Sequence, residues 1–299
     1  MKLKKIRNAL LVVLTLALVS ATAVAVTWAY VNKTLGSQTN TFTNTEEIDV
    51  GISEPNWKGE PTYASPYSPG DSVDQSITKD VNDGKTLANK YFAGLSIPKD
   101  PRLTNISYPT TTNQSQKDSS TEIVGVKLSY IVKDDSSNSY EYPSYADFRD
   151  SIAKVAFGST PTDGYNSNYW IAFDTNQLYL YHKAPIEWHE QTSNIFDYVV
   201  INTVSSITDY NNIPSDAKGI YTNGTNYSVR VYDPTLNSGA GGYKRITTNS
   251  LPDFDIKIKG YAVQSNPISS SLTDISGSGD TNKAARNALR SLMGLAAES

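Results

Sequence analysis

The chain has no cysteine and only two histidines and two methionines among its 299 residues. Without thiols it has no disulfide, no thiolate metal site and no cysteine nucleophile, so packing alone must stabilise its core. The net charge of −4 gives no reason to expect nucleic acid as a partner. Apolar runs are also scarce, and no second long one follows near the C-terminal end.

The one long apolar run lies at the N-terminal end. Residues 2–7 hold four basic side chains, and an uncharged, mostly apolar stretch follows over residues 9–26. With the small residues around Ala29, this pattern predicts an export signal cleaved between Ala29 and Tyr30. A retained membrane anchor is the alternative, because the run is long enough to cross a bilayer. Either way the rest of the chain is expected outside the cell, and the membrane is a partner only through this segment.

About 270 residues remain after the signal, enough for one large β domain or two smaller ones. Twenty tyrosines against seven phenylalanines is an unusual ratio. Tyrosine packs its ring while its hydroxyl stays wet, so it suits half-exposed sheet faces and contacts between proteins.

Most of this remainder alternates apolar and polar residues between Gly, Asn and Asp turns, which is typical of antiparallel strands. The pattern predicts a mainly β protein, with an antiparallel β-sandwich of jelly-roll type rather than a parallel α/β sheet. A β-hairpin is expected at residues 169–181, with its turn at 174–177. In the strand at 254–263, the spacing places Phe254, Ile256 and Ile258 on one face. The other expected strands are 48–52, 123–132, 195–201 and 227–232.

Two helices interrupt the β pattern. Ser144 can cap a helix that carries Phe148, Ile152 and Val155 on one stripe and stops at Gly158. An amphipathic helix is expected at about residues 282–295, after a Ser/Gly linker at 276–279 that predicts a loose tether.

Candidates for chemistry are few. His182 and His189 lie seven apart and straddle Pro185, unlike the four-residue spacing of a zinc-protease helix. They are the weak candidates for metal binding, and a solvated loop after the hairpin is the favoured reading. Residues 80–84 lack the ligand pattern of a calcium loop and read as a turn, while residues 239–242 read as flexible. No nucleophile or phosphate-binding motif is visible, so we expect a protein that is not an enzyme and holds no cofactor.

Several segments, taken in order, resemble the TasA/camelysin-like secreted proteins of Gram-positive bacteria, which a signal peptidase of the SipW type exports. The first match is the start of the mature chain, around residues 27–30 and 39–43. The others are the Lys99-Asp100-Pro101 strand region with its partner at 123–131, the hairpin at 170–181 continuing to 197, and the segment 254–264. The inserts at 110–120 and 203–224 depart from the pattern.

The resemblance implies a jelly-roll subunit, at residues 30–275, of extracellular fibres in a biofilm matrix or on the cell surface. It also implies that the N-terminal segment, residues 30–45, completes the sheet of the next subunit, with Val31, Thr41, Phe42 and Thr43 in the interface. An extended segment can add to an open sheet edge, and such a head-to-tail contact makes a homopolymer. The alternative is that this segment is a strand of its own domain or a floppy terminus.

Two other functions stay open. The first is a secreted metallopeptidase that would bind metal through His182 and His189. The second is a surface adhesion module that binds polymers through tyrosine-rich faces. For that module Tyr63, Tyr67, Tyr140, Tyr142 and Tyr145 are the candidates.

Overall fold

The computed structural model describes residues 32–34, 50–54, 88, 91–106, 121–176, 178–187, 190–207, 209–265, 268 and 272–298. The fold is mainly β and built from antiparallel sheets, as the alternating sequence pattern predicts. The jelly-roll connectivity stays a prediction.

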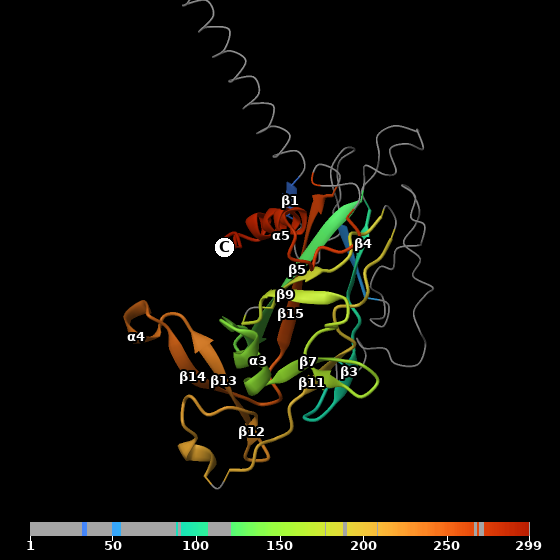
Figure 1. Cartoon of the computed structure of the whole chain (residues 1–299). Helices are drawn as coiled ribbons and strands as arrows, with labels where there is room; N and C mark the ends of the chain where they lie inside the picture. Colours follow the sequence, from blue (N-terminus) through green and yellow to red (C-terminus); the bar gives the residue numbers. More distant parts are fainter. Residues whose placement is uncertain are drawn as a thin grey trace, which may run out of the picture.

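The large sheet has six strands (Figure 1). Its order is β1–β15–β5–β10–β9, and β6 pairs with β5 beside β10. The strands are β1 (Asn32–Thr34), β5 (Glu122–Lys133), β6 (Ser139–Glu141), β9 (Trp170–Asp174), β10 (Tyr179–His182) and β15 (Phe254–Gln264).

Strand β5 forms at the centre of this sheet because its sequence alternates branched apolar residues and ends in a strong turn. It pairs with β15 along eleven residues without a register shift. The Asp134 carboxylate then accepts hydrogen bonds from the backbone N–H groups of Ser136 and Asn138, which closes the turn into β6. Such local acceptors stop a strand by offering the backbone a competing partner.

Three smaller sheets make up the rest of the β structure in the described part of the chain. The inner sheet has the order β3–β11–β7–β8, the small sheet β12–β13–β14, and β2 pairs with β4. Their strands are β2 (Val50–Ser53), β3 (Ser96–Pro98), β4 (Arg102–Asn105), β7 (Ala153–Phe157), β8 (Thr162–Asp163), β11 (Tyr198–Ile201), β12 (Tyr221–Thr222), β13 (Tyr227–Asp233) and β14 (Gly242–Thr248).

The main core lies between the large sheet and these smaller sheets. Fully buried side chains from β5, such as Val126 and Val132, share one cluster with Val155 of β7 and with Phe148 and Ile152. Phe254 and Ile256 pack at the margin of this cluster and Ile258 lies inside it, so the face predicted for this strand is confirmed.

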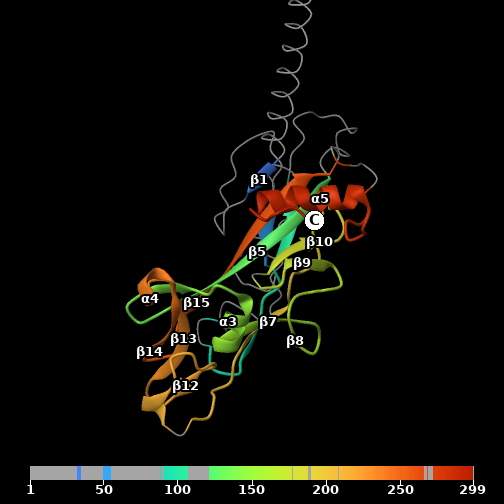
Figure 2. The same cartoon turned by 60° about the vertical axis from the view of Figure 1, so that its left-hand side comes forward.

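The opposite face of the large sheet is covered by helix α5 (Asp280–Leu292). Ala285, Leu289 and Met293 pack on Tyr261 and on other buried side chains of β5, β10 and β15 in a second apolar cluster. The helix lies across the sheet in both views (Figures 1 and 2). It is therefore docked, contrary to the loose tether expected from the Ser/Gly linker.

The first predicted helix is shorter than expected. Helix α3 spans Tyr145–Ser151, and the Ser144 hydroxyl caps it by accepting from the N–H of Asp147 at 3.1 Å, as predicted. Val155 is not in a helix but in β7, which pairs with β11. Other short helices among the described residues are α4 (Leu236–Gly239), where three residues have positive φ, and the 3-10 turn η2 (Tyr210–Asn212).

Candidate functional site

The outer edge of β15 is the first candidate site. Strand β1 pairs with only one end of it, with Asn32 opposite Val263 and Thr34 opposite Tyr261. From Phe254 to Gly260, no strand of the described part of the chain pairs with that edge. An unpaired strand edge presents N–H and C=O groups that can pair with another extended segment.

The side chains along this edge are amphipathic. Phe254 and Ile256 are half-buried and Ile258 is buried, whereas Lys257 is exposed. Gly260 lets the strand approach the β2–β4 pair, because a Cβ there would lie 3.3 Å from both Leu103 and Val50. A segment added to this edge would therefore meet an apolar face on the core side.

The predicted interface residues all lie outside the described residues. These include Val31, Thr41, Phe42 and Thr43, together with the predicted cleavage site at Ala29 and Tyr30. Within the same segment, however, residues 32–34 form β1 in the sheet of their own chain. For these three residues the structure shows the alternative arrangement, a strand of the domain to which they belong.

Helix α5 contacts both strands at this edge, since it lies against β1 as well as β15. Its position is fixed by Arg286, which donates to the backbone carbonyls of Ile275 and Gly277 and pairs with Glu298 at 2.7 Å. Gly125 of β5 makes room for it, because a Cβ there would lie 2.3 Å from Met293.

The histidine candidates are not brought together in the described residues. His182 ends β10 and is buried, so the solvated-loop reading is wrong for this residue. Its Nδ1 lies 2.7 Å from the Ala184 carbonyl oxygen, and its ring contacts the edge of Trp170. Burial lowers the pKa of His182, which favours the neutral imidazole. His189 and the loop at 80–84 lie outside the described residues.

A second candidate site is a pocket of about 460 Å³, which we call the polar notch. It opens where two strands share one edge of β5. β10 pairs with that edge up to Lys127 and β6 from Ile131 onward, so residues 128–130 have no strand partner there among the described residues. The backbone bond from Tyr145 to Asn176, at 2.7 Å, joins α3 to the hairpin turn nearby.

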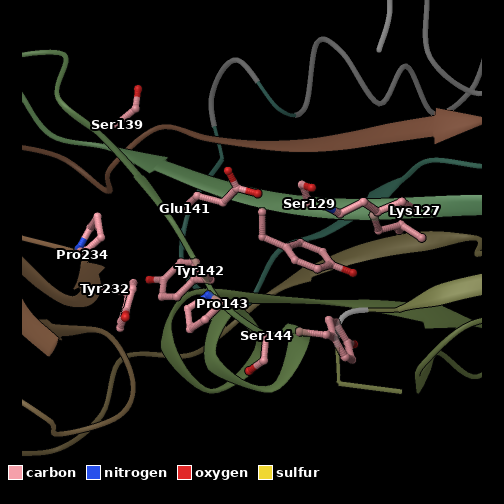
Figure 3. Close-up of a pocket in the computed structure, with 12 residues that line it drawn as sticks. Lys127, Ser129, Ser139, Glu141, Tyr142, Pro143, Ser144, Tyr232 and Pro234 are labelled. Carbon is pink, nitrogen blue, oxygen red and sulfur yellow. The ribbon is translucent and has the colours of Figure 1, made fainter. Parts of the chain in front are cut away.

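The lining of the polar notch mixes rings with hydrogen-bonding groups (Figure 3). Tyr232 of β13 and Pro234, which follows the end of that strand, lie beside Tyr142 and Pro143 in that view. The other lining residues are Lys127, Leu128, Ser129, Tyr130, Ser139, Glu141, Ser144 and Tyr145.

Three tyrosines form the buried wall of the notch, and they differ in their hydrogen bonds. The Tyr142 hydroxyl donates to the carbonyl of Arg230, and the Tyr145 hydroxyl donates to Asp163 at 2.5 Å. The Tyr130 hydroxyl is buried and has no partner within the described part of the chain. Burial raises the pKa of all three phenols, which keeps them neutral.

The small sheet is held against α3 by one buried cation. Arg230 of β13 pairs with Asp147 at 3.1 Å, donates to the Ser151 hydroxyl at 3.2 Å, and stacks over the Tyr243 ring at 4.3 Å. This contact fixes the distance between Tyr232 and the rest of the notch.

The sequence indicated Tyr140, Tyr142 and Tyr145 as candidates for an exposed tyrosine-rich face, but Tyr142 and Tyr145 are buried and do not form such a face. These two tyrosines line the notch. Tyr63 and Tyr67 lie outside the described residues. The notch itself was missed, because it depends on which strands pair with β5. The one feature of the sequence that hints at the notch is the short distance along the chain from the end of β5 to the tyrosines at 140, 142 and 145.

Comparison of the chain with protein-family models, with curated proteins and with solved structures finds no match. Within the residues that the structure describes, no helix is long and apolar enough to cross a membrane. In that same part of the chain, no three His, Asp or Glu side chains gather closely enough to hold a metal ion.

Proposed function

We propose that this chain is a secreted structural subunit that assembles head-to-tail into extracellular fibres of a biofilm matrix or cell surface. The proposal includes export by a signal peptidase of the SipW type and a jelly-roll fold. The observation that supports assembly is the edge of β15, where a short strand from the N-terminal region covers one end and no other strand of the described residues pairs with the rest.

Exchange of β1 between subunits would explain how this edge leads to a fibre. When a segment pairs with its own sheet in a monomer, the same contact can form with a neighbour's sheet at little cost. When each subunit gives its segment to one neighbour and receives a segment from a different one, and the rotation between neighbours does not close a ring, the contact produces a filament. β1 in its own sheet thus marks the position that a neighbour's segment occupies in the fibre.

The observed register makes the proposal specific. Thr34 lies opposite Tyr261. If a donated segment kept this register along the edge of a neighbouring subunit, Gln38 would lie opposite Lys257 and Thr41 opposite Phe254. Lys257 is exposed, so cysteine is tolerated there. The chain has no cysteine of its own, so an engineered pair reports only the intended contact.

Two single-cysteine proteins, Gln38→Cys and Lys257→Cys, are prepared without the signal segment. They are then mixed and oxidised gently. We expect a disulfide-linked heterodimer, because residues directly opposite on antiparallel strands have Cβ atoms about 4.5–5.5 Å apart. Lys259→Cys, two residues along the same edge, is the out-of-register control and should cross-link poorly. A double variant that carries both Gln38→Cys and Lys257→Cys tests the alternative. If it forms the disulfide only within one molecule, and the two single variants never link, exchange between subunits is contradicted.

Electron microscopy of the mature protein tests the polymer directly. Filaments are expected, and deletion of residues 30–45 should abolish them while the circular dichroism spectrum of the folded domain is kept. If the truncated protein polymerises normally, strand exchange is wrong. Zinc analysis of the same material tests the metallopeptidase alternative, which requires stoichiometric metal.

A further inference from the structure

The polar notch holds hydrogen-bonding groups that the fold does not use. Within the described residues, the side chains of Glu141, Ser129 and Ser139 make no hydrogen bond or ion pair. Lys127 has only the ring of Tyr179 beneath its ammonium group, at 5.3 Å. Carboxylate oxygens accept, ammonium groups donate and serine hydroxyls do both, so these groups match a ligand that also does both.

The notch also offers ring surfaces at the solvent. Pro143 and Pro234 are exposed and Tyr232 is half-exposed, whereas Tyr142 and Tyr145 are buried behind them. Arg230 and the helix cap at Ser144 hold these walls in place without contributing free groups. A preformed pocket of 460 Å³ with a few convergent polar groups lies in the usual range for small-molecule sites, about 300–1,000 Å³.

The composition of the lining argues against three other ligand classes. One lysine beside one glutamate does not form the cationic cluster that selects phosphate groups. A metal site would need several oxygen ligands, and Glu141 is the only carboxylate in the lining. A peptide strand does not fit, because the backbone groups of β5 at the notch are already used: the Leu128 N–H donates to the Leu178 carbonyl at 3.4 Å, and the Tyr130 carbonyl accepts from the Tyr142 N–H at 2.9 Å.

We propose that the polar notch binds a short segment of a polysaccharide. A sugar ring has an apolar C–H face that can pack on Tyr232, Pro143 and Pro234, and hydroxyl groups that donate to Glu141 and exchange hydrogen bonds with Ser129 and Ser139. The ligand is neutral overall, as the balanced lining requires. The binding needs no fibre, but repetition of the notch along a polymer would add avidity to a weak single site.

The test is calorimetric titration of the signal-processed protein with three neutral tetrasaccharides: chitotetraose, cellotetraose and isomaltotetraose. At least one should bind with a Kd of about 0.1–1 mM. Glu141→Ala and Tyr232→Ala should each weaken that binding at least tenfold, since the first removes the only carboxylate and the second a ring wall. Glu141 is exposed, so its replacement leaves folding intact even if Tyr232→Ala disturbs the small sheet.

Tyr169→Ala is the matched control, because Tyr169 is an exposed ring, at 51%, that does not line the notch. It should bind as the unmodified protein does. No binding of any tetrasaccharide at about 10 mM overturns the proposal. So does binding that Glu141→Ala and Tyr232→Ala leave unchanged, or tighter binding of inorganic phosphate or of a tetrapeptide at the same residues. None of these results bears on filament formation, which is scored separately.

Discussion

At the scale of single residues, the partners of buried polar groups decide what each group contributes. Tyr130 and Tyr142 both lie in the wall of the polar notch, and both are almost fully buried. One hydroxyl donates to a backbone carbonyl and the other has no partner in the described chain. Because a buried hydroxyl without a partner has lost its water and gained nothing, the two residues should respond differently to the same change.

Removal of the hydroxyl tests this difference. Tyr142→Phe should lower the free energy of unfolding by about 0.5–1.5 kcal/mol, because it leaves the Arg230 carbonyl without its donor. Tyr130→Phe should be neutral or stabilising, because the ring still stacks on Phe148 with centroids 4.6 Å apart. Urea unfolding of both variants gives the comparison. A larger loss for Tyr130→Phe would mean that its hydroxyl has an unseen partner.

The buried His182 predicts how stability depends on pH. Its folded-state pKa is lowered, so the unfolded chain takes up a proton first as the pH falls below about 6.5. Stability from this residue is therefore complete above that pH and lost below it, by at most about 1.4 kcal/mol per pH unit. Urea midpoints between pH 7 and 5.5 should show the slope in the natural chain and in His189→Gln, but not in His182→Gln. Equal slopes in all three proteins would contradict it.

At the scale of elements, the parts that depend on local sequence were predicted well. The hairpin of β9 and β10, the strands β5, β13 and β15, and the cap of α3 are confirmed because periodicity and turn residues specify them. The strand β7 was missed because Phe148, Ile152 and Val155 also fit a helical stripe. Only the distant partner β11 decides between the two. The notch and the β15 edge could not be predicted, since both are defined by which strands pair.

A glycine in β5 makes room for α5. Gly125→Ala should lower the free energy of unfolding by about 1–3 kcal/mol, because its Cβ would lie 2.3 Å from Met293 and 2.9 Å from the Leu180 carbonyl oxygen. Gly260→Ala is the matched change in the neighbouring strand and should cost less, because its Cβ would meet only the methyl groups of Leu103 and Val50, both at 3.3 Å, and no backbone atom. Thermal unfolding compares the two. The reverse order would show that α5 does not sit over Gly125.

At the scale of the whole molecule, the unpaired edge of β15 gives the proposed filament a polarity. A subunit that donates its N-terminal segment at one end and accepts at the other forms a polar filament, whose ends differ chemically. The acceptor edge belongs to β15, which is held by β5 along its whole length and so does not depend on β1.

Protein without residues 30–45 keeps the acceptor but has no donor, so it should cap only one end of a growing filament. In two-colour fluorescence, seeds grown with a small fraction of this protein should elongate at a single end. Protein that also lacks the acceptor, through Ile256→Pro, is the control and should leave both ends active. Capping of both ends, or of neither, would contradict a head-to-tail contact at β15.

Strand β1 and helix α5, which come from opposite ends of the sequence, meet at one flank of the large sheet. In both views the turn at α4 projects from the side of the molecule, away from α5 (Figures 1 and 2). A fluorescent or affinity tag joined behind α5 would therefore crowd the place where subunits join. The same tag inserted at α4 would project from the finished filament and leave every junction clear.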